Sequence, residues 1–239
     1  MTEDGLTYVG QELEIFVHAV NWKSYWASNI HNWIKGDVLE VGAGIGANTA
    51  LLYHPGVQSW LCLEPDPQLA SHVTHATAEL PSCHVITGTV AAVQQQRFDC
   101  ILYIDVLEHI ETDRDEIAAS AKLLRPGGHL IVLSPAHQFL FSNFDAAIGH
   151  YRRYAKSSLR RLLPANCFQE ALFYLDSVGM FASLANRLML RQSLPTVKQI
   201  KTWDSYIVPV SRVVDPLLGK MLGKTIISVF TRSDQEVHA

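Results

Sequence analysis

Residues 38–49 read VLEVGAGIGANT, and this stretch decides the fold of the chain. Its apolar first half predicts a buried strand, and its closely spaced glycines predict a tight turn that leads into a helix. Glycine suits such a turn because it reaches positive φ and lets the backbone approach a ligand without an intervening Cβ. Residues 38–49 therefore predict a strand–turn–helix unit with a ligand at the turn.

Further short apolar runs follow at regular intervals, with helical stretches between them. Continuous rather than alternating hydrophobicity is typical of strands that are covered on both faces. One helix is predicted to open at Thr112, with Asp115 as its capping-box partner, and to end at the stop signal RPGG of residues 125–128. This alternation predicts an α/β fold with a parallel, doubly wound sheet. Its strands are expected at residues 38–41, 59–64, 83–87, 98–104 and 129–134.

The flanks of this region follow a different pattern. Residues 8–34 predict one or two amphipathic helices rich in aromatic side chains, which either pack on the sheet or cover a ligand as a lid. After residue 134 the strand–helix rhythm stops. The elements expected there are a long loop with a short basic helix at 135–167, a strand at 168–175, helices at about 178–191 and 198–222, and a last strand at 225–230.

Composition excludes several classes of protein. The chain has 239 residues, of which 48% are hydrophobic and 18% charged, so it is not a disordered protein. It has no run of roughly 18 apolar residues that would span a bilayer, and its acidic first residues do not resemble a signal peptide, so a cytoplasmic location is expected. The cysteines form no C-x-x-C pair, so neither a disulfide framework nor a metal site is expected. They are Cys62, Cys83, Cys100 and Cys167.

Charge is distributed unevenly along the chain. Residues 1–145 contain 6 Lys/Arg against 17 Asp/Glu, whereas residues 146–239 contain 13 Lys/Arg against 6 Asp/Glu. An acidic half suits a cationic ligand and a basic half suits an acidic one. The alternative is that both halves are simply solvated surfaces.

A second feature supports the ligand at the turn. The strand after the glycine turn ends at Glu64, 18 residues past Gly46. An acidic residue there suits the ribose diol of either a nicotinamide dinucleotide or S-adenosylmethionine. Dinucleotide sites favour G-x-G-x-x-G, but the glycines here are Gly42, Gly44 and Gly46, and Glu40 precedes them. An acid before the turn would repel a pyrophosphate but suits a cationic sulfonium.

On these residues the chain resembles class I S-adenosylmethionine-dependent methyltransferases that act on small molecules. Four blocks match in order within residues 38–134: E-x-G-x-G-x-G at 40–46, the acid Glu64, DVLEH at 105–109 and LRPGG at 124–128. The resemblance implies a Rossmann-like, seven-stranded sheet of order 3-2-1-4-5-7-6, with the last strand antiparallel. It also implies one domain over residues 1–239, made of a helical cap (1–35), a cofactor-binding half (36–134) and an acceptor-side half (135–239).

The resemblance also assigns roles around the cofactor, S-adenosyl-L-methionine. The glycines of the turn would line its methionine and ribose parts, and Glu64 would hold the ribose hydroxyls. Many relatives carry an Asp after the third strand to read adenine, where this chain has Gly88 and Thr89. The Thr89 hydroxyl or backbone groups would take that part. The other residues expected near the cofactor are Glu40, Pro65, Asp66, Asp105, Val106 and His109.

The acceptor side is predicted from residues that follow the fifth strand. Methyl transfer to a hydroxyl or an ammonium group needs a base, and the candidates are His109, His137 and His150. His109 follows Glu108 in the DVLEH block, so the base is expected to be His137 or His150. Asp145 would orient a histidine tautomer. Arginine suits a bidentate clamp on a carboxylate or phosphate, although the pair here would equally suit a helix surface. The expected acceptor-binding residues are Tyr25, Asp145, Tyr151, Arg152 and Arg153.

Several functions stay open at this point. The leading one is methylation of a hydroxyl or amine on a small acidic or aromatic molecule. The alternatives are a carboxyl methyltransferase that needs no base and a non-catalytic module that binds S-adenosylmethionine. Nucleic-acid methylation is disfavoured because the chain is acidic and lacks a basic extension. Residues 206–230 are apolar with interspersed basic residues, which suits a membrane surface but is more often a core helix followed by a strand.

Overall fold

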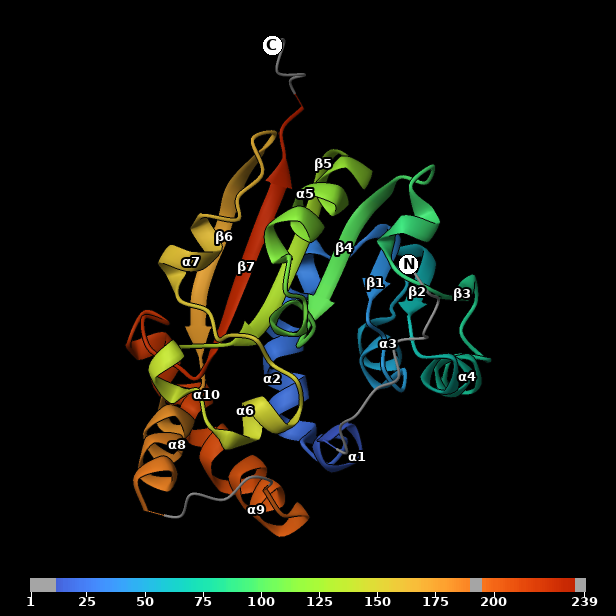
Figure 1. The fold of residues 1–239 in the computed structure, drawn as a ribbon. Helices are drawn as coiled ribbons and strands as arrows, with labels where there is room; N and C mark the ends of the chain where they lie inside the picture. Colours follow the sequence, from blue (N-terminus) through green and yellow to red (C-terminus); the bar gives the residue numbers. More distant parts are fainter. Residues whose placement is uncertain (1–11, 190–194, 235–239) are drawn as a thin grey trace.

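The computed structural model describes residues 12–189 and 195–234, which form a seven-stranded sheet with helices on both faces (Figure 1). The strand order is β3-β2-β1-β4-β5-β7-β6, and β7 is antiparallel to both of its neighbours. The predicted fold class and strand order are therefore confirmed. The strands are β1 Gly36–Val41, β2 Val57–Glu64, β3 Cys83–Thr87, β4 Phe98–Ile104, β5 Leu124–Pro135, β6 Cys167–Leu175 and β7 Thr225–Arg232.

Both faces of the central strands are buried, which explains their continuous hydrophobicity. Val38 belongs to the core on one face and Leu39 to the core on the other, and neither is exposed. The first core includes α2 (Val20–Ile30), whose Trp26 is fully buried. The second core is closed by α5 (Asp113–Leu123). The aromatic N-terminal segment thus packs on the sheet through α2.

The strands β1, β2, β4 and β5 all run in the same direction, so their carboxyl ends meet at one edge of the sheet. Helical segments from both flanks gather beyond this edge (Figure 1). They are α1 Glu12–Phe16, α6 Asn143–Ala147, α8 Ser177–Met189 and α9 Val197–Thr202, continued by a π-helical turn, Trp203–Ile207, and by α10 Val208–Leu217. The remaining α-helices are α3 Ala47–Leu52, α4 Pro67–Ala76 and α7 Lys156–Arg160.

Buried carboxylates anchor these helices to the sheet. Asp215 of α10 accepts hydrogen bonds from the Tyr25 hydroxyl at 2.9 Å and from the backbone N–H of Asp176 at 2.7 Å. Asp176 in turn accepts from the indole N–H of Trp203 at 2.8 Å. Asp204 accepts from the backbone N–H of Trp22 at the start of α2, also at 2.8 Å. Because each of these buried carboxylates accepts several hydrogen bonds, together they join α2, the end of β6 and the π-helical turn with α10.

Three local predictions differ from the structure. The helix expected over 198–222 is broken by the π-helical turn and ends at Leu217. Strand β5 begins at Leu124, so the RPGG signal lies inside the strand, where the register with β4 shifts. Helix α5 begins where predicted, but Thr112 makes no side-chain capping bond because its backbone is not in the extended conformation (ψ 50°).

Parts of two predicted helices, residues 8–11 and 190–191, lie outside the described residues. Within the described ranges, no helix is both long and apolar enough to cross a membrane.

Candidate functional site

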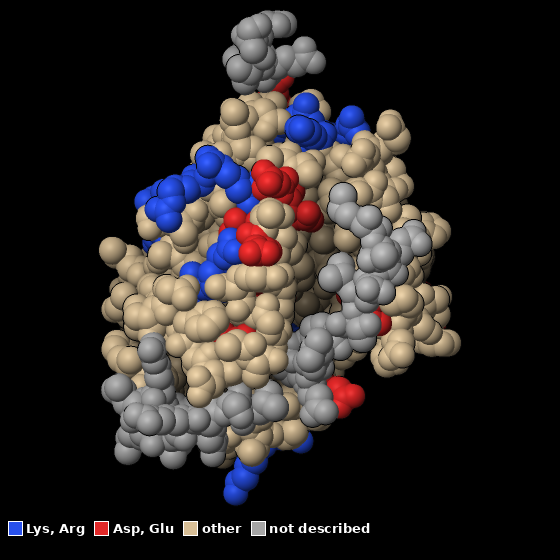
Figure 2. Space-filling model, viewed as in Figure 1, with Lys and Arg blue, Asp and Glu red and all other residues tan. Residues whose placement is uncertain are grey.

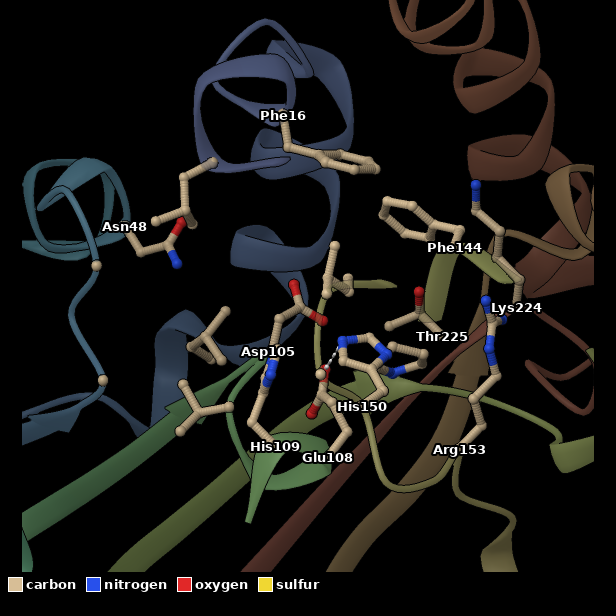
Figure 3. Close-up of a pocket in the computed structure, with 18 of the residues that line it drawn as sticks. Phe16, Asn48, Asp105, Glu108, His109, Phe144, His150, Arg153, Lys224 and Thr225 are labelled. Atoms are coloured by element: carbon tan, nitrogen blue, oxygen red, sulfur yellow. Dashed lines mark ion pairs between the residues drawn. The ribbon is translucent and has the colours of Figure 1, made fainter. Parts of the chain in front are cut away.

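A cavity of about 1530 Å³ opens at the carboxyl edge of the parallel strands. Its lining comes from the glycine turn, from the ends of β2, β3 and β4, and from the helices beyond the sheet edge. Figure 3 shows Asp105, Glu108 and His150 pointing toward one another on one side of it, with Phe16 and Phe144 across from them. One continuous cavity is therefore lined by residues of both the expected cofactor-binding half (36–134) and the expected acceptor-side half (135–239).

The glycine turn adopts the backbone that its sequence predicts. Gly42, Gly44 and Gly46 have φ values of 69°, 60° and 78°, which only glycine adopts readily. Gly42 and Gly44 line the cavity, whereas Gly46 does not. A Cβ on Gly46 would lie 3.0 Å from the Cβ of Ala76 and 3.3 Å from the Cα of Val73. Gly46 thus serves the close packing of α3 against α4.

Glu64 lines the cavity beside the turn and is 5% exposed. Its carboxylate accepts hydrogen bonds from the backbone N–H of Gly44 at 2.8 Å and of Asp66 at 3.0 Å. Burial raises the pKa of Glu64, and these two bonds oppose the shift. The carboxylate is therefore fixed at the place where β2 ends, with its remaining acceptor capacity available to a ligand.

Glu40 does not take the position expected of it. Its carboxylate is 1% exposed, does not line the cavity, and accepts hydrogen bonds from the Thr49 hydroxyl at 2.5 Å and the Trp60 indole N–H at 3.0 Å. Burial raises the pKa of Glu40 to about 7, against the lowering effect of those two bonds. Glu40 of β1 thus links α3, through Thr49, and β2, through Trp60, by hydrogen bonds.

We expect Glu40→Gln to raise stability at alkaline pH. Between pH 4.5 and about 7 the folded chain holds a proton that the unfolded chain releases, so Glu40 favours folding below this window and loses that contribution as pH rises through it. A Gln cannot ionise and keeps an acceptor oxygen for Thr49 and Trp60. Urea unfolding should show a gain of about 2 kcal/mol at pH 8 that shrinks toward pH 5. The exposed Glu79→Gln is the control, and a loss of stability at pH 8 would contradict this account.

The residues that follow β2 and β3 also line the cavity. Pro65, Asp66, Gly88 and Thr89 all line it. Asp66 also caps α4, accepting from the backbone N–H groups of Gln68 at 2.7 Å and Leu69 at 3.2 Å. Asp66 therefore helps to set the shape of this part of the cavity.

Asp105 directly follows β4 and has a φ of 54°, an uncommon conformation for a residue with a Cβ. Its side chain is exposed to the cavity, but many protein atoms pack around the carboxyl group. This environment desolvates the carboxyl and raises its pKa to about 6, against the opposing charges of His150 and Lys23. Val106 follows on the wall, where its Cγ2 lies only 2.6 Å from where a Cβ on Gly42 would be.

His150 is held by a buried carboxylate. The His150 Nδ1 lies 3.0 Å from Asp145 Oδ1, and the Arg153 guanidinium donates to both oxygens of Asp145 at 2.7 and 2.9 Å. Burial would raise the pKa of Asp145, yet the bonds from His150 and Arg153 outweigh it and hold that pKa well below its usual range. An ionised Asp145 accepts the Nδ1 proton of His150, which leaves Nε2 as the acceptor nitrogen on the cavity side.

Glu108 and His109 complete the cluster around His150. Glu108 is fully buried, one of its oxygens accepts from the Ser134 hydroxyl at 2.9 Å, and the other has no hydrogen-bond partner and lies 3.9 Å from His150 Nε2. Burial raises the pKa of Glu108 well above its usual value and lowers that of His109 to about 4. The donor atoms of Glu108, His109 and His150 lie within 4.8 Å of one another, close enough to hold a metal ion, a grouping that the sequence did not suggest.

Other predicted residues lie outside the cavity lining. His137 stacks on Tyr174 at 4.7 Å and on Phe139 at 5.1 Å between ring centroids, so it is not placed to act as a base on a ligand. Tyr25 is 3% exposed, and its hydroxyl is bonded to Asp215. Arg152 pairs with Asp113 at 2.8 Å. Because Arg153 is already paired with Asp145, the expected two-arginine clamp is not formed.

Two lysines of the cavity, Lys224 and Lys23, are not among the residues that the sequence suggested. Lys224 lines it, with its Nζ 3.3 Å from Asp176 and 3.8 Å from the centroid of the Trp203 ring. Lys23 of α2 also lines it, and burial lowers the pKa of both ammonium groups. Lys224 could have been found, because an antiparallel last strand must start at the edge where the parallel strands end. Nothing in the sequence of α2 marks Lys23.

Comparisons with known proteins agree with this geometry. A family model described as a methyltransferase domain matches residues 23–170, which is more than half of the chain. No curated protein matches the sequence at a significant level.

Solved structures share the fold at low sequence identity. The N-methyltransferase NodS from Bradyrhizobium japonicum matches with a TM-score of 0.54 and 16% identity over 97% of this chain and 99% of its own. Coclaurine N-methyltransferase, solved with N-methylheliamine and S-adenosyl-L-homocysteine (SAH), matches with a TM-score of 0.60 and 12% identity over 90% and 72%. The protein bound to the Haloferax volcanii Trm112 methyltransferase activator matches with a TM-score of 0.62 and 13% identity over 95% and 97%.

The family match covers the part of the cavity lining formed by Gly42, Gly44, Glu64, Asp105 and His150. The chain belongs to the methyltransferase-domain family and is a class I S-adenosylmethionine-dependent methyltransferase.

Proposed function

We propose that the chain methylates a hydroxyl or amine of a small acidic or aromatic molecule, with His150 as the base. The observation that carries this proposal is that the glycine turn, Glu64 and His150 line one cavity. A cofactor at the turn and an acceptor beside His150 would then meet inside the protein, which is what in-line methyl transfer requires.

The cofactor half of the proposal follows the lining of the cavity. Gly42 and Gly44 would face the methionine and ribose, Glu64 the ribose hydroxyls, and Asp105 and Val106 the region of the sulfonium. Pro65, Asp66, Gly88 and Thr89 would surround the adenine. Asp105 and Glu64 supply negative charge where the cofactor is cationic or carries donor hydroxyls. S-Adenosylmethionine supplies the methyl group, and the protein supplies position and shelter from water.

The acceptor half of the cavity combines cations with aromatic side chains. Lys224, Lys23 and Arg153 are the cationic groups that line it. Phe16, Phe144 and Trp203 line it as well, and the rings of Phe16 and Phe144 lie 6.3 Å apart between centroids. Such a lining suits a molecule that carries both an acidic group and an apolar or aromatic body. Arg153 is held by two hydrogen bonds to Asp145, whereas the Lys224 ammonium has a single 3.3 Å contact with Asp176. Lys224 therefore replaces the arginine pair as the group proposed to bind the acid.

The acceptor has to lose a proton, and His150 is the group proposed to take it. Asp145 fixes its tautomer, so Nε2 is free to accept the proton on the cavity side. A carboxyl acceptor would not need this base, because a carboxylate is already a nucleophile. Two of the proteins that share the fold, NodS and coclaurine N-methyltransferase, are N-methyltransferases, which supports an amine acceptor over a carboxyl group.

A methyl-transfer assay over a panel of acceptors tests this function. The panel would pair phenols and amines that carry a carboxylate with the same compounds lacking it, with transfer of labelled methyl from S-adenosylmethionine as the readout. We expect turnover with the acidic members and at least about tenfold lower kcat/KM without the carboxylate, the scale of a hydrogen bond to a charged group. We expect chelator treatment to leave the rate unchanged. Loss of activity on chelation would instead indicate a metal ion bound by Glu108, His109 and His150, and would contradict the role of His150 as the base. Turnover of simple carboxylates alone would favour the carboxyl-methylating alternative.

A further inference from the structure

Helix α10 and the π-helical turn before it bury polar side chains against the protein and expose apolar side chains on the opposite side. The residues facing the protein include Asp204, Ser211 and Asp215, all of which are buried. The opposite side carries an exposed apolar stripe. Its members are Tyr206 (74% exposed), Val210 (49%), Val213 (65%) and Leu217 (81%). Their spacing of four, three and four residues places them on one side of a helix, and Met221 follows at 68% exposure.

The buried side of this segment is already satisfied within the protein. Asp215 accepts hydrogen bonds from Tyr25, Asp176 and Ser177, and Ser211 donates to Asp176 at 2.6 Å. Because these polar groups are hydrogen-bonded within the protein, this side of the helix stays buried and the apolar stripe stays exposed. The sequence interpretation of a core helix is correct for Val208, which is 1% exposed and belongs to the core, but wrong for Val210, Val213 and Leu217, which are exposed.

The surface around the stripe is basic. Between residues 177 and 224 the sequence has two acidic residues, Asp204 and Asp215, and both are buried. The exposed charged side chains that the structure describes in the same segment are Lys198, Lys201 and Arg212. Figure 2 shows Lys or Arg side chains projecting at the lower edge of the molecule, where Figure 1 places α9. Within residues 177–224 the apolar stripe is therefore accompanied by exposed cations, while both acids of the segment are buried. This combination complements a surface that is anionic on the outside and apolar beneath.

We propose that the stripe of Tyr206, Val210, Val213, Leu217 and Met221 docks on the surface of an anionic lipid bilayer. Apolar side chains would enter the boundary between headgroups and acyl chains, and the lysines and Arg212 would lie against the anionic headgroups. The same helical segment lines the cavity with its other side, through Ile200, Trp203 and Ile207. Docking would therefore place the cavity next to the membrane. This proposal does not depend on which acceptor is methylated.

Co-sedimentation of the full chain with lipid vesicles tests the proposal. We expect binding to vesicles that contain phosphatidylglycerol, weaker binding to pure phosphatidylcholine, and release by added salt. Val213→Glu and Leu217→Glu should each weaken binding at least about tenfold, because each places a charge where an apolar side chain would be buried. Lys198→Gln with Lys201→Gln should reduce the salt dependence.

Phe168→Glu is the matched control, since Phe168 is also exposed but lies near the start of β6, at the opposite end of the sheet. It should bind vesicles like the wild type. All variants should keep their affinity for S-adenosylmethionine, which shows that they are folded. Absence of binding to the anionic vesicles, or equal binding by Leu217→Glu, would overturn the proposal. So would a dimer in solution that Val213→Glu dissociates, because the stripe would then be a contact between two copies.

Discussion

Replacing His150 with Ala should lower kcat for the acceptor found in the panel by about 10²–10⁴-fold, the usual contribution of a general base. The affinity for S-adenosylmethionine should change little, because His150 is proposed to face the acceptor and not the cofactor. The physical reason is that Asp145 holds the His150 tautomer with Nε2 free, and no other group proposed here takes the acceptor's proton. Steady-state kinetics with calorimetric cofactor binding measures both quantities.

His137→Ala is the matched control for this experiment. It removes the other histidine that the sequence offered as a base, but His137 stacks on Tyr174 outside the cavity lining. Its kcat should stay within a few-fold of the wild-type value. If His150→Ala keeps a normal kcat, the acceptor needs no base and the carboxyl-methylation reading is favoured. If His137→Ala carries the large loss instead, the proposed placement of the acceptor is wrong.

Glu64→Ala should weaken the binding of S-adenosylmethionine and of SAH equally, by about 1.5–3 kcal/mol. The loss is equal because both ligands carry the ribose diol that Glu64 is proposed to hold. Glu64→Gln should lose less, since it keeps one acceptor oxygen for the N–H groups of Gly44 and Asp66. Unchanged affinity in Glu64→Ala would show that the ribose lies elsewhere in the cavity.

The backbone of the glycine turn and the position of Glu64 could be predicted because local sequence controls them. A buried strand that runs into glycines with positive φ, as at Gly42 and Gly44, has few alternatives, and the end of β2 puts Glu64 beside it. Glu40 shows the limit of this reasoning. Its place before the turn is visible in the sequence, but the direction of its side chain is set by Thr49 and Trp60, which only the packed sheet brings near.

The acceptor end depends on contacts between distant segments. The sequence shows Arg152 and Arg153 side by side, but not that Asp113 and Asp145 already pair with them. Lys224 reaches the cavity only because β7 runs antiparallel to β5.

Helix α10 illustrates the same limit on a surface. The spacing of its apolar residues predicts an apolar stripe along one side of the helix. The spacing does not show whether the apolar side or the polar side packs against the protein. That choice is made by Asp204 and Asp215, which find donors on α2 and at the end of β6.

Calorimetric titration of the chain with S-adenosylmethionine, its demethylated product and NADH tests the central claim most directly. The account predicts that the first two bind in the micromolar range, about −7 to −8 kcal/mol, and that NADH gives no measurable heat of binding. The spacing of Gly42, Gly44 and Gly46 departs from the G-x-G-x-x-G pattern that seats a pyrophosphate, and the Glu64 carboxylate accepts a hydrogen bond from the backbone N–H of Gly44 at the turn. Preferential binding of NADH, or no binding of S-adenosylmethionine, would contradict the account.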